Sequence, residues 1–276
     1  MENNPKPITA AWGNRDGEDV LLDIYLPEQP TGAVYVFFFG GGWIVGNKET
    51  FECFGTLRRA LLNAGVTIVA PNYRLCGNGR KFPVPVDDCA DALRWLAVHG
   101  GEYGLDPTRV AVGGISAGGH LSLMMGLAGE QFGDRSQPFP TIRCIADMCG
   151  PSDLRTNRNV PEKETISECY AALFGSEESG WEAQYDAASP ITYLRAKPDD
   201  TPLPPLMAVH SQLDKLVFHS QSELMVAEYQ RRGMEATLLT MENSSHAFGG
   251  IEGMPPPKPT FFRMQEQMAS FIVAHI

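Results

Sequence analysis

Basic residues are scarce in this chain of 276 residues, with 22 Lys and Arg against 33 Asp and Glu and a formal net charge of −11. They form no cluster along the sequence. Because nucleic acids and anionic membrane surfaces bind concentrated positive charge, the composition argues against both as partners. A small neutral molecule is compatible with this charge.

Metal-ligand spacings are absent as well. The cysteines form no CxxC pair and no Cys/His spacing suited to zinc; they stand at positions 53, 76, 89, 144, 149 and 169. Several lie in apolar runs such as RCIADMC at 143–149, where a small buried hydrophobic residue is the expected role. We therefore expect neither a metal nor a cofactor.

Long apolar segments are also missing. The first residues, MENNPKPITAAWG, contain no stretch as long as a signal peptide, and no segment approaches the length of a membrane span. The sequence thus predicts a cytoplasmic protein, and secretion would require that a leader had been removed. The oligomeric state is left open, a homo-oligomer included.

Short apolar runs alternate with segments of helical period, the pattern of a mostly parallel sheet covered by helices. Central strands are predicted at 20–26, 34–39, 66–70, 110–113, 142–148, 206–210 and 236–241. Helices are predicted at 51–63, 86–99, 117–127, 220–232 and 261–275. Residues 1–276 are therefore expected to form a single α/β domain.

Residues 155–188 interrupt this alternation. The segment is polar and acidic, and it is too short to build a core of its own. A lid-like helical insertion over the site is the better interpretation. Two roles are open for its aromatic residues and for Trp43: they line an acyl pocket, or they pack the insertion. The aromatic residues of the segment are Tyr170, Phe174, Trp181 and Tyr185.

The segment Gly114-Ile115-Ser116-Ala117-Gly118 matches the G-x-S-x-G pattern between an expected strand and an expected helix. Small residues around the serine permit a sharp turn that exposes its hydroxyl, and the helix N-terminus favours a developing oxyanion. Ser116 is therefore the predicted nucleophile. A dinucleotide-binding loop is excluded because GGISAGG lacks the G-x-G-x-x-G spacing.

Acyl transfer also needs hydrogen-bond donors for the oxyanion. Three glycines follow the strand at 34–39, the position from which a loop supplies backbone N–H groups in this kind of fold. The predicted donors are the amides of Gly41, Gly42 and Ala117.

The catalytic base is expected late in the chain. His246 lies in NSSHAFGG, directly after the last predicted strand, and is the predicted base. His219 begins a helix and could line the pocket, whereas His210 and His120 suit structural roles. His99 and His275 fall at helix ends and are expected at the surface.

The acid of the triad should follow the penultimate strand. Asp214, in VHSQLDKLV, occupies that loop and leaves room for one helix and one strand before His246. It would hold the imidazole tautomer and stabilise the imidazolium. Asp153 and Glu242 are less well placed alternatives.

These residues resemble the α/β-hydrolase esterases related to hormone-sensitive lipase and to bacterial feruloyl/acetylxylan-type carbohydrate esterases. The likeness runs over nearly the whole chain, through FFFGGGW, PNYRL, YGLDPTRVAVGGISAGGHLS, CGPSDL, AASPITY and SSHAFGG. It implies an eight-stranded α/β-hydrolase fold, and the short N-terminal part favours the carbohydrate-esterase branch.

Two residues depart from the family pattern. Phe39 stands where the family has a histidine before the glycines, and Ile115 stands where it has an acidic residue before the serine. Both replace a polar group near the oxyanion hole, while the backbone donors survive. Phe39, Ile115, Trp43 and His219 are the predicted substrate-binding residues.

The leading hypothesis is a serine carboxylic ester hydrolase that acts through an acyl-enzyme on short, acetyl-like esters of sugars or plant-derived alcohols. An arylformamidase-like amide hydrolase would use the same machinery. A receptor on a non-catalytic hydrolase scaffold is the third hypothesis, and the retained triad residues argue against it.

Overall fold

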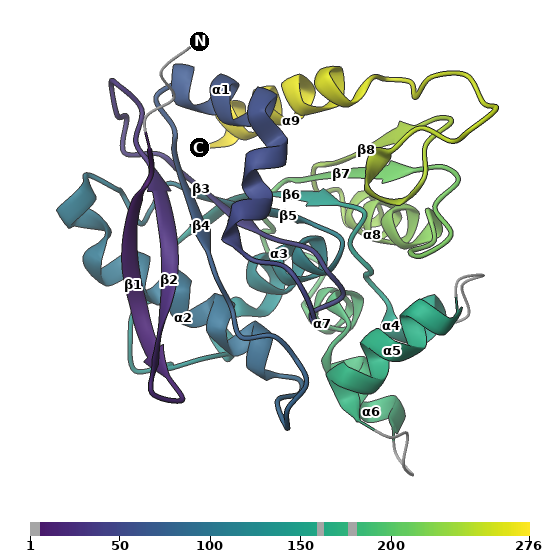
Figure 1. Cartoon of the computed structure of the whole chain (residues 1–276), viewed down its shortest axis with the longest axis horizontal. Coiled ribbons are helices and arrows are strands. Elements are labelled where there is room, and N and C mark those ends of the chain that lie inside the picture. The colour runs from purple at the N-terminus through teal and green to yellow at the C-terminus, as the bar shows by residue number, and fades with distance from the viewer. Residues whose placement is uncertain (1–5, 159–162, 176–180) are drawn as a thin grey trace.

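The computed structural model describes residues 6–158, 163–175 and 181–276 around one eight-stranded sheet (Figure 1). The strand order is β1-β2-β4-β3-β5-β6-β7-β8; β2 is antiparallel to β1 and β4, and the other pairs are parallel. The strands are β1 (Ile8–Arg15), β2 (Glu18–Tyr25), β3 (Val34–Phe38), β4 (Thr67–Pro71), β5 (Val110–Ile115), β6 (Ile142–Met148), β7 (Leu206–Ser211) and β8 (Ala236–Met241). The expected mostly parallel α/β sheet of eight strands is confirmed.

Helices cover both faces of this sheet. On one face α1 packs against α9, and on the other α2, α3, α7 and α8 lie side by side (Figure 1). The α-helices are α1 (Gly55–Asn63), α2 (Val84–His99), α3 (Ala117–Ala128), α4 (Leu154–Asn157), α5 (Lys163–Phe174), α6 (Trp181–Ala187), α7 (Pro190–Ala196), α8 (Ser220–Arg231) and α9 (Phe261–His275). Short 3-10 turns are η1 (Lys48–Phe54), η2 (Gly100–Tyr103), η3 (Gly129–Gln131) and η4 (His246–Phe248). Among the described residues, no helix combines the length and apolarity needed to cross a membrane.

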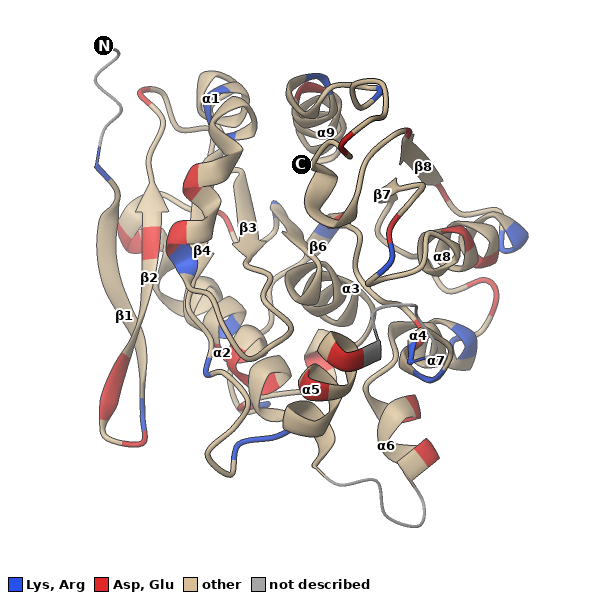
Figure 2. Ribbon diagram, turned by 45° about the vertical axis from the view of Figure 1, so that its right-hand side comes forward, with Lys and Arg blue, Asp and Glu red and all other residues tan. Residues whose placement is uncertain are grey.

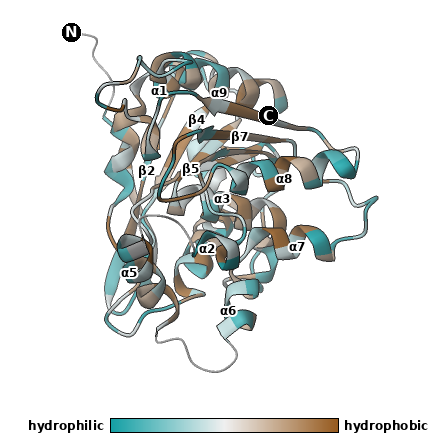
Figure 3. Cartoon of the chain, turned by 90° about the vertical axis from the view of Figure 1, so that its right-hand side faces the viewer, coloured by the Kyte–Doolittle hydropathy of each residue, from teal (hydrophilic) through white to brown (hydrophobic). Residues whose placement is uncertain are grey.

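The central strands owe their continuous apolar sequences to this two-sided cover. Every residue of β3, β4, β5 and β7 is buried, because alternate side chains point into one or the other helix layer. Figure 3 shows strong hydrophobic colouring in β7, one of these strands. The carboxyl ends of the parallel strands therefore meet at one rigid edge of the sheet.

Strand β1 and turn η1 were not predicted. In β1 only Trp12 is buried, since the strand is an edge strand that pairs with β2 alone and bulges between Ala11 and Gly13. Its sequence thus lacks the apolar alternation of a half-buried strand. The predicted helix at 51–63 is divided: a 3-10 turn runs to Phe54, and α1 begins at Gly55.

The segment between β6 and β7 holds helices α4 to α7, and Figure 2 shows acidic positions on α5 and α6. Within the predicted insertion at 155–188, residues 159–162 and 176–180 lie outside the described residues. Its aromatic rings pack on one another: Tyr185 contacts Phe174, Trp181 and Tyr170 at centroid distances of 4.3, 4.9 and 5.4 Å. Packing explains these aromatics, and the roles of the segment as a lid and of the chain as one domain stay predictions.

Candidate active site

Ser116 occupies the sharp turn between β5 and α3. Its backbone adopts φ 56° and ψ −119°, a conformation that L-residues rarely occupy. A Cβ atom added at Gly114 would lie 2.4 Å from the carbonyl oxygen of Phe38, and one at Gly118 would lie 2.0 Å from the same oxygen. Glycine on both sides is therefore a steric condition for this turn.

Three predicted residues come together at the carboxyl edge of the sheet. Ser116 follows β5, Asp214 follows β7 and His246 follows β8. His246 Nε2 lies 2.9 Å from Ser116 Oγ, and His246 Nδ1 lies 2.7 Å from Asp214 Oδ2. The three side chains thus form a continuous hydrogen-bonded chain from a part-exposed hydroxyl to a buried carboxylate.

Asp214 is held firmly by its own loop. Its Oδ1 accepts hydrogen bonds from the amides of Leu216 and Val217, each at 2.9 Å. Burial alone would raise the pKa of Asp214, but His210, His246 and the amide of Val217 more than offset it and hold the pKa well below its ordinary value. The group is therefore a carboxylate, with Oδ2 free to orient the imidazole.

His210, expected to be structural, contacts this acid. The ring is fully buried, and its Nε2 lies 3.0 Å from the carbonyl oxygen of Val217 and 3.4 Å from Asp214 Oδ2. Its Nδ1 lies 2.7 Å from Ser222 Oγ. In the sequence, this contact is indicated by the position of His210 at the end of β7, four residues before the predicted acid.

Cys149 stands beside the imidazole, a contact that the sequence did not reveal. Its sulfur and one ligand atom each of His246 and Asp214 all lie within 4.8 Å of one another. Burial lowers the pKa of His246, but Cys149 and the hydrogen bond to Asp214 raise it overall. The expected burial of Cys149 is confirmed, yet the residue is part of the site and not of the core alone.

The predicted oxyanion loop runs beside the serine. A Cβ at Gly40 would lie 2.7 Å from the carbonyl oxygen of Ile115 and 3.3 Å from Cβ of Ser116. Gly41 and Gly42 have φ values of 117° and 59°, which favour glycine. Within the described part of the chain, the amides of Gly41, Gly42 and Ala117 make no hydrogen bond to protein, so they are available to a ligand.

Two contacts hold the other side of this loop. Trp43 Nε1 donates to Nδ1 of His120 over 3.2 Å, and Nε2 of His120 lies 2.7 Å from the carbonyl oxygen of Ala188. Burial lowers the pKa of His120 to about 4, which keeps the ring neutral and able to accept this bond. In addition, a Cβ at Gly42 would lie 2.3 Å from Sγ of Cys169 in α5.

The predicted substrate-binding side chains differ in their exposure. Phe39 stacks on Tyr73 at 4.1 Å with its ring buried, and Trp43 is buried against His120, so neither presents a free face to the site. Ile115 is 8% exposed beside the serine. His219 lies between Thr240 and Glu223 without a hydrogen bond to the triad.

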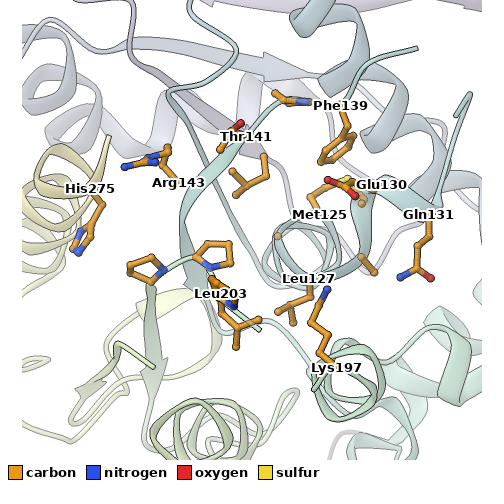
Figure 4. A pocket seen from close by; sticks show the side chains of 18 of the residues that line it. Met125, Leu127, Glu130, Gln131, Phe139, Thr141, Arg143, Lys197, Leu203 and His275 are labelled. Carbon is orange, nitrogen blue, oxygen red and sulfur yellow. The ribbon is translucent and has the colours of Figure 1, made fainter. Parts of the chain in front are cut away.

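A cavity of about 650 Å³ lies away from this site (Figure 4). Its lining includes Met125, Arg143, Leu203 and His275, from the end of α3, the start of β6, the loop before β7 and the end of α9. Because β6 and β7 begin there, the cavity opens at the edge of the sheet opposite to Ser116. It contributes nothing to the chemistry of the triad.

Residues 22–229 match the family model BD-FAE. Carboxylesterase NlhH of Mycobacterium tuberculosis is 32% identical over 139 residues, which are 49% of this chain and 43% of NlhH. An ethyl acetate hydrolase of Pseudomonas putida is 27% identical over 85% of this chain and 73% of its own length. The chain thus matches less than half of NlhH and most of the hydrolase.

Among solved structures, esterase 2 of Thermogutta terrifontis, phosphonylated by sarin, superposes with a TM-score of 0.77. The superposition covers 99% of this chain and 96% of that chain at 23% identity. At this identity the likeness concerns the fold, and it confirms the predicted α/β-hydrolase architecture.

Proposed function

The chain belongs to the BD-FAE family of α/β-hydrolase esterases, and on this basis we propose that it is a serine carboxylic ester hydrolase with Ser116 as nucleophile. One observation carries the proposal beyond the family: Ser116, His246 and Asp214 form one continuous hydrogen-bonded chain. A nucleophile, a base, an orienting acid and oxyanion donors are the groups that acyl transfer requires.

In the proposed reaction, Ser116 Oγ attacks the ester carbonyl while its proton passes to Nε2 of His246. Asp214 accepts the Nδ1–H bond, keeps the ring in the tautomer whose Nε2 is free, and stabilises the imidazolium without taking the proton. His246 then protonates the departing alkoxide, which leaves an acyl group on Ser116. A water molecule, deprotonated by the same ring, releases the acid and restores the serine.

The amides of Gly41, Gly42 and Ala117 would bind the oxyanion of the tetrahedral intermediate. These N–H groups belong to the backbone, so little reorganisation would be needed as charge develops. The loss of one such donor typically costs about 3 kcal/mol of transition-state stabilisation. Phe39 and Ile115 do not remove these donors, because the donors belong to the backbone.

We propose short acyl groups, acetyl in particular, on alcohols of sugar or plant origin. The relative from Pseudomonas putida bears the name of a hydrolase of ethyl acetate, an ester with a two-carbon acyl group. The rings of Phe39 and Trp43 are buried, so neither offers a face to a long acyl chain. Sugars as the alcohol component rest on the resemblance to carbohydrate esterases.

The test is a chain-length series of p-nitrophenyl esters with purified protein and with Ser116→Ala. Turnover should be fastest on acetate or butyrate and should fall to background in S116A. Undiminished turnover in S116A would refute the mechanism, and fastest turnover on long chains would refute the short-acyl specificity. A fluorophosphonate probe should label Ser116 in wild type, and its failure to label would favour a receptor.

Amide hydrolysis is the competing assignment because it would use the same groups with a poorer leaving group. Side-by-side rates on N-formylkynurenine and on an aryl acetate separate the two. We expect the acetate to be the better substrate, and the reverse order would assign the protein to formamide hydrolysis.

A further inference from the structure

Cys149 is aimed at the triad by an unusual backbone. It follows β6 with φ 46°, a left-handed conformation that glycine adopts at low cost and a cysteine does not. Its amide is fixed by a 2.8 Å hydrogen bond to the carbonyl oxygen of Val209, and its side chain is fully buried. The chain therefore holds a strained thiol next to His246 where a glycine would fit the backbone better.

Cys149, His246 and Asp214 offer one sulfur, one nitrogen and one oxygen within 4.8 Å of one another. Thiolate, imidazole and carboxylate are the ligand types that zinc prefers, and soft thiolate selects zinc or cadmium over magnesium or calcium. Three protein ligands and one solvent position make a common zinc arrangement. The side chain of His246 is 20% exposed, whereas those of Asp214 and Cys149 are buried, so an ion would reach the cluster past the imidazole.

We propose that Cys149, His246 and Asp214 form an inhibitory site for a thiophilic divalent cation such as Zn²⁺ or Cd²⁺. The ion replaces the Nδ1 proton of His246 and binds Nδ1, Oδ2 of Asp214 and Sγ of Cys149. Nδ1 and Oδ2 lie 2.7 Å apart, and they must separate to about 3.3 Å to accept two bonds of about 2.0 Å each. The site would be empty in the active enzyme and filled when such a cation is in excess. The inhibition, though not the binding, rests on the proposed function.

The protons that move when the ion binds explain why binding would stop catalysis. The thiol proton of Cys149 leaves to solvent, and the Nδ1 proton of His246 moves to Nε2, so the ring stays neutral. The divalent charge is balanced by one thiolate and one carboxylate. With Nε2 protonated, His246 no longer accepts the proton of Ser116, and the nucleophile loses its base.

Binding can be tested without turnover. The Cd²⁺–thiolate bond absorbs in the ultraviolet, and we expect S116A titrated with Cd²⁺ to develop this absorption with one equivalent bound. Adding Cys149→Ser or Cys149→Gly to S116A should abolish it; the glycine variant suits the positive φ and guards against misfolding. Cys53→Ser, at the exposed cysteine, is the matched control and should retain it. Absorption that survives in both Cys149 variants would overturn the site.

Inhibition is measured separately with a chromogenic acetate. Loss of a group that only orients a metal ligand costs about 10- to 100-fold in metal affinity. Cys149 would be a ligand itself, so C149S should need at least about tenfold more Zn²⁺ for half-inhibition than wild type. EDTA should restore activity, and Cys53→Ser, at the exposed cysteine, should respond as wild type. Equal sensitivity of wild type and C149S would refute the inhibitory site, whereas an inactive wild type that still binds Cd²⁺ would refute only the esterase assignment.

Discussion

At the scale of single residues, the site is a set of side chains whose neighbours fix their protonation and direction. Asp214 receives two backbone N–H bonds on one oxygen and His246 on the other, with His210 close by. The carboxylate is thus oriented before substrate arrives. His120 similarly fixes Trp43, next to the oxyanion glycines, by accepting a hydrogen bond from its indole N–H.

Asp214→Asn should reduce kcat by about 10⁴-fold with little change in folding, because the amide would favour the imidazole tautomer that cannot take the proton of Ser116. Steady-state kinetics on an aryl acetate and a thermal melt provide the measurement. Glu242→Gln is the matched control, since Glu242 is exposed and was the rival acid in the sequence. An E242Q effect as large as that of D214N would contradict the assignment.

His120→Ala should lower kcat by about tenfold and leave KM less affected, because the oxyanion loop loses an anchor while substrate contacts persist. Trp43→Phe removes the donor of the same hydrogen bond. If His120 acts by positioning Trp43, the two substitutions will be non-additive in the double variant. Additive losses would argue against positioning. Failure of His120→Gln, whose side chain can accept a hydrogen bond, to recover activity would argue against it as well.

At the scale of elements, the meeting of strand ends creates the site. The serine, acid and base each follow a different parallel strand, and the helix after β5 begins immediately at Ala117. This crossing of β5, α3 and β3 is so close that a carbonyl of Phe38 occupies the space of a Cβ at Gly118.

Gly118→Ala should destabilise the protein by at least about 2 kcal/mol, because the added methyl group meets backbone atoms that have no room to move. Gly55→Ala is the control: its Cβ would contact nothing within 4 Å, and its backbone is helical. We expect G55A to be neutral or stabilising by roughly 0.5–1 kcal/mol. Urea unfolding midpoints measure both, and equal midpoints for the two variants would be contrary to this prediction.

The sequence predicted most elements because buried parallel strands and amphipathic helices leave strong periodic signals. It failed at β1, whose edge position leaves one buried residue, and at η1, which shares its apolar residues with the helix after it. The proximity of Ser116, His246 and Asp214 could be predicted because the motif and the chain order constrain their positions. The contact of Cys149 with His246 could not be found, since it joins the ends of β6 and β8 across the sheet and depends on a rare backbone angle.

At the scale of the whole molecule, acid sensitivity should be visible in stability. Burial lowers the pKa of His120 to about 4, whereas the unfolded chain has the ordinary value of 6.5. The folded state therefore binds fewer protons between these values. Its free energy of unfolding is unaffected by this group above pH 6.5 and falls as the pH drops toward 4.

His120→Gln removes this titration and should flatten the loss. Wild type should lose about 1–3 kcal/mol more than H120Q between pH 7 and pH 4.5. Urea unfolding at several pH values is the measurement, and it does not require activity. His99→Gln serves as control because His99 is at the surface end of α2. Parallel pH profiles for wild type and H120Q would show that His120 is not the responsible group.

The contact between Cys169 and Gly42 has a consequence for how this protein can change. Gly42 must stay glycine because of its φ of 59°, and the sulfur of Cys169 fills the space beside it. A mutation at position 169 that adds bulk would thus displace a loop far away in the sequence. When the helices between β6 and β7 are varied to select for new substrates, the active variants should keep a small residue at position 169. In a library that randomises this position freely, most variants should be inactive.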